Sequence, residues 1–174
     1  MNYTFTSSRL GFRNWKFEDI EKMHQINIDK DVMKFFPSIP SYKETESFVL
    51  RMQNSYIKNG YCYFAVDILE PKEFIGFIGL SLQIFESEFT PCVDIGWRLK
   101  TAAWGKGFAT EGAKRCLEFG YDSLNLKNIY AIAPVLNIKS QQVMEKIGMR
   151  KITTFLHPKI ELGHSLQECV LYEK

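Results

Sequence analysis

The fold is decided by the stretch Trp97-Arg-Leu-Lys-Thr-Ala-Ala-Trp-Gly-Lys-Gly-Phe-Ala-Thr-Glu111. It joins a predicted strand, which ends at Leu99, to a predicted helix that begins at Phe108. Glycines at 105 and 107 let the backbone approach a ligand closely and turn its N–H groups towards it. Because a helix N-terminus adds partial positive charge, the stretch predicts an anion site. A plain turn that needs positive φ also explains the glycines, and this alternative stays open.

Three classes of phosphate ligand compete for this loop. A nucleotide-binding P-loop needs Ser or Thr after its Lys, whereas Gly107 follows Lys106. A dinucleotide fingerprint needs a third Gly where Thr110 stands, and an acidic residue at the end of the next strand, which residues 128–133 lack. What remains is a pyrophosphate held by backbone amides, with the rest of a cofactor lying along a strand edge.

The order of hydrophobic patterns along the chain indicates one mixed α/β domain over residues 1–174. Strands are expected at 6–13, 61–69, 74–85, 92–99, 128–133, 150–155 and 168–172. Helices are expected at 16–29, 41–58, 108–121 and 137–147, with a short helical turn at 31–37. The order predicts an antiparallel meander in the first half and a βαβ crossover in the second.

Composition narrows the class of protein. A formal net charge of +2, with no run of basic residues, argues against a nucleic-acid binder. No apolar run approaches the roughly 18 residues that span a bilayer, and residues 1–10 do not resemble a signal peptide. The cysteines are scattered without a CxxC pair, so neither a metal site nor a disulfide framework is expected: Cys62, Cys92, Cys116 and Cys169. We therefore expect a cytoplasmic protein without a membrane partner.

A wider set of motifs resembles one enzyme family. Asp94-Ile-Gly-Trp-Arg-Leu99, followed by Trp104–Glu111, looks like the acetyl-CoA-binding core of GNAT N-acetyltransferases, in the branch that resembles RimJ and RimL. The family signature Gln/Arg-x-x-Gly-x-Gly/Ala is met by residues 102–107, except that Ala102 replaces the leading polar residue. Segments 9–13, 74–80, 137–149 and 157–172 also resemble the family, so the likeness covers nearly the whole chain.

The resemblance implies a GNAT fold, with a mostly antiparallel central sheet, a splayed cofactor edge and flanking helices. It implies that the backbone of one strand binds the pantetheine arm of acetyl-CoA, through Ile95, Trp97 and Leu99. It implies a pyrophosphate cradle built from Trp104, Gly105, Lys106, Gly107, Phe108, Ala109 and Thr110. Asn137 and Ser140 would bind the cofactor arm as well. Both also suit the start of a helix, where Asn137 is a good N-cap and Ser140 a first-turn serine.

Catalysis in this family is direct attack of an amine on the thioester, within a ternary complex. It requires a group that takes a proton and a group that stabilises the departing thiolate. Met144 occupies the position of the tyrosine that many relatives use for the thiolate, so Ser140, one turn earlier on the same face, is the candidate. Asp94 is the candidate base. A solvent-facing or ion-paired Asp94, with a water chain as the base, is the alternative.

These residues predict an N-acetyltransferase that moves an acetyl group from acetyl-CoA to a primary amine, either a protein N-terminus or a small molecule. Fold likeness does not transfer the acceptor. A non-catalytic CoA-binding sensor is the alternative, and a protein that binds another phosphate ligand is a weaker one. Early aromatic residues, Phe36 among them, could wall the acceptor pocket or belong to the core. A homodimer is left open.

Overall fold

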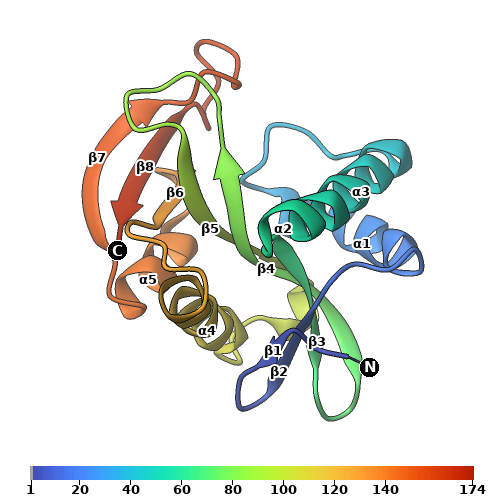
Figure 1. Cartoon of the computed structure of the whole chain (residues 1–174). Coiled ribbons are helices and arrows are strands. Elements are labelled where there is room, and N and C mark those ends of the chain that lie inside the picture. The colour runs from blue at the N-terminus through green and yellow to red at the C-terminus, as the bar shows by residue number, and fades with distance from the viewer. Residues whose placement is uncertain (1) are drawn as a thin grey trace.

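Eight strands form one sheet in the computed structural model, which describes residues 2–174 (Figure 1). Their order across the sheet is β1-β2-β3-β4-β5-β6-β8-β7. The strands are β1 Phe5–Thr6, β2 Leu10–Arg13, β3 Tyr63–Ile68, β4 Glu73–Gln83, β5 Cys92–Leu99, β6 Tyr130–Pro134, β7 Arg150–Leu156 and β8 Glu168–Glu173. Met1, the first residue of the predicted domain, lies outside the described residues.

Helices cover both faces of this sheet. They are α1 Asp19–Asn27, α2 Lys30–Met33, α3 Tyr42–Asn59, α4 Phe108–Asp122 and α5 Ile138–Lys146, with a 3₁₀ turn at Thr101–Ala103. Figure 1 shows α1, α2 and α3 together on one side, and α4 beside α5 on the other. The predicted mixed α/β fold is confirmed, with a mostly antiparallel sheet.

Local signals in the sequence explain where the helices begin and end. Ser41 and Glu44 form a reciprocal capping box at the start of α3, and Gly60 ends that helix in the left-handed conformation. Asn137 caps α5 by accepting a hydrogen bond from the Ser140 amide. Such caps satisfy backbone groups that have no partner within the helix, and they fix where each helix starts.

The meander β2-β3-β4-β5 is antiparallel throughout, and β5 then meets β6 in parallel after the α4 crossover. Ile78 and Leu80 on β4 face α4, because their side chains come within contact distance of the glycines of that helix. By alternation, the partner residues Trp97 and Ile95 on β5 share that face. The residues that alternate with them along β5, which include Asp94 and Arg98, therefore lie on the opposite face, beside α1 and α3.

The predicted opening strand over residues 6–13 is in fact two short strands. β1 and β2 pair antiparallel around a turn at Ser7 and Ser8, so a tight hairpin replaces one continuous strand. The turn is held from outside, since the Ser7 hydroxyl and the Arg9 amide both donate to Glu111 on α4. A contact across about a hundred residues cannot be recognised from local alternation.

A buried charge cluster fastens α1 to the sheet. The Arg13 guanidinium on β2 donates to both oxygens of Asp19 on α1, at 2.6 and 2.9 Å, and to both oxygens of Asp67 on β3, at 2.7 and 3.0 Å. All three side chains are almost completely enclosed. Since each buried oxygen finds a donor, the cluster fixes α1 over the end of the meander.

No helix of residues 2–174 is long and apolar enough to cross a membrane.

Replacing Arg13 by Met leaves two enclosed carboxylates without their donor. We expect the free energy of unfolding to fall by about 3–5 kcal/mol, as for other broken buried ion pairs. Urea denaturation followed by circular dichroism measures the change. The control is Lys16→Met, which removes the exposed ion pair with Glu18 and should cost less than about 1 kcal/mol. Equal losses for the two variants would contradict a structural role for the cluster.

Candidate active site

The edge of β5 that faces β6 is almost unpaired. One residue pair, Asp94 with Tyr130, joins the two strands. Beyond it the Lys100 amide donates to Ile75 on β4, whereas the Leu99 carbonyl accepts from the Trp104 indole. Because backbone groups alternate between the two edges of a strand, Ile95, Trp97 and Leu99 direct theirs away from β4.

These are the three residues predicted to bind the pantetheine arm by their backbone. The structure places all three at the same edge of β5. The Leu99 carbonyl is already engaged, since the Trp104 indole nitrogen donates to it at 2.8 Å. Ile95 directly follows Asp94, where β5 pairs with β6, whereas the backbone of Trp97 makes no hydrogen bond to residues 2–174 outside the sheet ladder. Trp97 is therefore the member of this set with the most freedom to pair with a ligand.

The glycine loop adopts the backbone that its sequence suggests. Gly105 and Gly107 have φ of +72° and +81°, a left-handed region that other residues rarely enter. Within residues 2–174, the amides from Gly107 to Thr110 donate to no backbone carbonyl outside the helix, and no side chain caps α4. Four successive donors at a helix N-terminus thus stand without a protein acceptor.

Contacts from distant segments hold this loop in place. The Arg9 guanidinium donates to the Lys106 carbonyl at 3.1 Å and pairs with Glu111 at 2.7 Å. It also lies 4.5 Å from the centre of the Phe108 ring. Glu111 is therefore used as an anchor for the β1–β2 turn, and not as a cap for the free amides.

Two elements meet across the opening between β5 and β6. The Lys139 ammonium at the start of α5 lies 5.1 Å from the centre of the Trp104 ring. Trp104, Leu136 and Ile138 are large apolar side chains that remain exposed there. The loop and the N-terminal end of α5 are thus neighbours.

The start of α5 places the remaining predicted residues. The side-chain oxygen of Asn137, Oδ1, caps the helix by accepting from the Ser140 amide. The NH₂ group of the same side chain has no partner in residues 2–174. The Ser140 hydroxyl also makes no hydrogen bond there, whereas its amide binds Asn137. Met144, one turn later, is 2% exposed and packs in the core. Its position therefore serves packing, and Ser140 supplies the hydroxyl on that face.

The Asp94 side chain neither faces solvent nor forms an ion pair within residues 2–174. Its carboxylate is 7% exposed, so it does not face solvent, and no cation of residues 2–174 pairs with it. It accepts from the Tyr63 hydroxyl at 2.7 and 2.8 Å and from the Gln83 amide at 2.9 Å. Burial raises the pKa of Asp94 to about 6, although these hydrogen bonds oppose the rise.

Sequence reasoning missed the partners of Asp94. Tyr63 comes from β3 and Gln83 from β4, and the Tyr63 ring lies over Gly96 and stacks on Phe77 at 5.1 Å. Burial, together with the adjacent Asp94, raises the pKa of Tyr63 well above its ordinary value, so its hydroxyl stays a donor. Alternation along β5 could have shown that Arg98 shares the face of Asp94. No local signal marks the two cross-strand partners.

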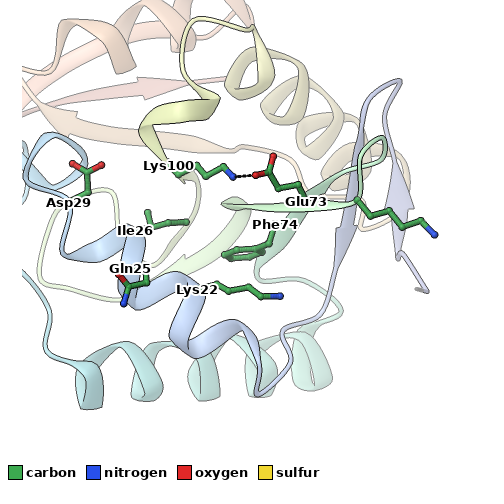
Figure 2. Close-up of a pocket in the computed structure, with 8 residues that line it drawn as sticks. Lys22, Gln25, Ile26, Asp29, Glu73, Phe74 and Lys100 are labelled. Carbon is green, nitrogen blue, oxygen red and sulfur yellow. Dashed lines mark hydrogen bonds and ion pairs between the residues drawn. The ribbon is translucent and has the colours of Figure 1, made fainter.

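A surface cavity of about 520 Å³ lies apart from these residues, between α1 and the start of β4. Figure 2 shows Lys22, Gln25 and Ile26 on α1 lining it opposite Phe74. Lys100, the residue that follows β5, pairs here with Glu73. None of the predicted site residues lines this cavity.

Comparison with known proteins agrees with this arrangement. A family model described as an acetyltransferase (GNAT) domain matches residues 9–150. The chain is 30% identical over 147 residues, 84% of its length, to an uncharacterised N-acetyltransferase, YnaD, of Bacillus subtilis, of which the match covers 82%. An acetyltransferase of the GNAT family from Bacillus anthracis has a TM-score of 0.80 at 27% identity, over 97% of this chain and 96% of that one.

A further solved structure shares the fold. RimL, a ribosomal L7/L12 alpha-N-protein acetyltransferase in complex with coenzyme A, superposes with a TM-score of 0.80 at 14% identity, over 99% of this chain and 97% of that one. At this identity the likeness shows the fold alone.

The raised pKa of Asp94 has a consequence for stability. Between about pH 4 and pH 6 the folded protein keeps a proton that the unfolded chain has lost, so stability falls as the pH rises through this range. Asp94→Asn removes that cost. We expect the variant to be more stable than the wild type at pH 8 by about 1–3 kcal/mol, with a smaller difference at pH 4.5. A less stable variant at pH 8 in urea denaturation would contradict this.

Proposed function

Because the chain belongs to the GNAT acetyltransferase family, we propose that it transfers an acetyl group from acetyl-CoA to a primary amine by direct attack in a ternary complex. The amine is a protein N-terminus or a small molecule. Family membership supports N-acetyltransferase activity, and the residues around the free edge of β5 support the mechanism.

The described residues fit a CoA thioester on three grounds. Free amides from Gly107 to Thr110 suit a pyrophosphate, and the space beside Gly105 is open, with no atom within 4 Å of where a Cβ would stand. The edge of β5 suits an extended arm that adds as a further strand. Asn137 has a free amide donor at the far side of the same opening. The wider cradle would comprise the backbone of Trp104–Thr110, and Ser140 would face the arm.

Acetyl-CoA supplies the acetyl group in activated form, as a thioester, and leaves as the free thiol. The acceptor enters as an ammonium, which must lose a proton before its nitrogen can attack. Asp94 is the proposed base, and a pKa of about 6 leaves it mostly ionised at neutral pH while keeping it a stronger base than an ordinary aspartate. Tyr63 and Gln83 hold the carboxylate in place by donating to it.

Ser140 is the proposed donor to the departing thiolate. Its hydroxyl has no partner in the described chain, and the buried Met144 cannot donate a hydrogen bond from the position where relatives carry a tyrosine. A serine hydroxyl is a weak acid, so it stabilises the thiolate by a hydrogen bond while a proton arrives from solvent.

The observation that carries the catalytic role is the enclosed, cation-free carboxylate of Asp94 beside the opening in the sheet. A non-catalytic CoA sensor would need the amide cradle and has no use for a carboxylate that destabilises the fold. Acetyl-CoA as the donor and the cytoplasmic location stay predictions of the sequence, and a homodimer stays open.

The first test is a thiol-release assay with acetyl-CoA and a panel of amines and peptides. We expect release above the hydrolysis background, with kcat/KM rising with pH through an inflection near 6 as Asp94 ionises. Asp94→Asn should lose about 10²–10⁴ of kcat/KM and that inflection, and Ser140→Ala should lower kcat by about 10-fold. Binding of acetyl-CoA without release on any amine would favour the sensor.

The second test concerns the cradle. Gly105→Val should abolish binding of acetyl-CoA in calorimetry, because valine disfavours φ of +72° and its branches enter the space beside the loop. The matched control is Gly163→Val, whose φ of +84° and open surroundings bring the same strain far from the site. Gly107→Val should also abolish binding. A folded Gly105→Val protein that binds as tightly as the control variant would mean that the loop is only a turn.

A further inference from the structure

Arg98 is a partly buried arginine that has no ion-pair partner within residues 2–174. It lies on β5, four residues after Asp94 and on the same face. No carboxylate of residues 2–174 lies within ion-pair distance of its guanidinium. By contrast, Arg13 is met by two aspartates. The chain therefore supplies counter-charges where an arginine is structural, and it supplies none for Arg98.

The contacts of Arg98 leave Nε and Nη2 without a hydrogen-bond partner in residues 2–174. Nη1 donates to the Asn27 side chain at 2.7 Å, and the Phe36 and Phe77 rings lie 4.0 and 5.6 Å from Cζ. Nε is buried without a hydrogen-bond partner, and Nη2 makes no hydrogen bond to the described chain. Burial lowers the pKa of Arg98 to about 10, so the group stays charged near neutral pH.

The side of a guanidinium that carries Nε and Nη2 is one that recognises anions. Nε and Nη2 point in parallel and form a fork that matches the two oxygens of a carboxylate or phosphate. An enclosed charge without a partner costs free energy, so its retention indicates a counter-charge from outside the chain. The Phe36 ring, 4.0 Å from Cζ, is itself 37% exposed, so the Arg98 guanidinium lies close to the protein surface.

Position connects Arg98 with the proposed base. Tyr63 binds Asp94 and stacks on Phe77, and the Phe77 ring in turn lies 5.6 Å from the Arg98 guanidinium. Four residues of strand separate the two Cα atoms by about 13 Å. One acceptor molecule could thus place its amine near Asp94 and an anionic group near Arg98.

Resting on the proposed function, we propose that Arg98 is the acceptor-binding residue for an oxyanion, and that the natural acceptor is a primary amine that also carries a carboxylate or phosphate. Such an acceptor is either a small amino acid or a peptide with an acidic residue close to its N-terminus. Nη2 of the guanidinium donates to the oxyanion, and the bound anion completes the pairing that the fold omits.

The experiment compares matched pairs of acceptors with the full chain and acetyl-CoA. 6-Aminohexanoate is set against hexylamine, and Gly-Asp amide against Gly-Asn amide, so the two arms separate a small acceptor from a peptide. We expect kcat/KM to favour the anionic member of at least one pair by about 10-fold or more. Arg98→Gln, which keeps a donor for Asn27, should abolish that preference while changing the neutral amines by less than about 3-fold.

Two further readouts keep the inference testable. The melting temperature of Arg98→Gln should stay close to that of the wild type, because removal of an unpaired charge offsets the lost contacts with Asn27 and Phe36, and its acetyl-CoA affinity should be unchanged. If no amine is acetylated, calorimetry of 6-aminohexanoate and Gly-Asp amide with the CoA-bound protein still reports binding and its dependence on Arg98.

Equal use of anionic and neutral acceptors, or an equal loss for both in Arg98→Gln, would overturn the role of Arg98 and leave the acetyltransferase proposal intact. A protein that binds an anionic amine through Arg98 and acetylates nothing would overturn the acetyltransferase proposal and leave the role of Arg98 intact. A marked loss of stability in Arg98→Gln would show that the residue is structural.

Discussion

The separation of β5 from β6 is the constraint on which the rest of the site depends. A strand in the middle of a sheet normally uses its backbone groups on both edges, but β5 is joined to β6 by one residue pair. The α4 crossover leaves the sheet at this point, so the free edge and the free amides of a helix N-terminus occur together. An extended ligand with an anionic group at one end is the chemistry that satisfies both.

Some charged side chains in this sheet are paired with opposite charges, and others are not. In the cluster around Arg13, every carboxylate oxygen has a donor, and the cluster fastens α1 to the meander. On the same side of the sheet, Asp94 is buried and Arg98 is partly buried. Both lie on β5, and neither has a partner of opposite charge within residues 2–174. Groups that are kept at a cost to stability, beside an opening in the sheet, are typical of a site that acts on a ligand.

The sequence predicts a structural feature well when a single residue type determines the local backbone conformation. Gly105 and Gly107 do, because their φ angles are those that other residues avoid, and the loop was expected where it occurs. The helix start at Asn137 was predictable for a similar reason. Asp94 was placed correctly in its strand, but its burial and its hydrogen bonds with Tyr63 and Gln83 depend on the register of three strands. The isolation of Arg98 is a property of packing, which no local pattern shows.

The central claim is that the edge of β5 and the N-terminus of α4 hold acyl-CoA through backbone groups. Residue-resolved amide hydrogen exchange by NMR, with and without saturating acetyl-CoA, tests it most directly. The account predicts strong protection of the amides of Trp97 and of Gly107 to Thr110 on binding, with Gly163 unchanged. Binding that leaves those amides unprotected, or that protects the cavity beside Lys22 and Phe74 in their place, would contradict it.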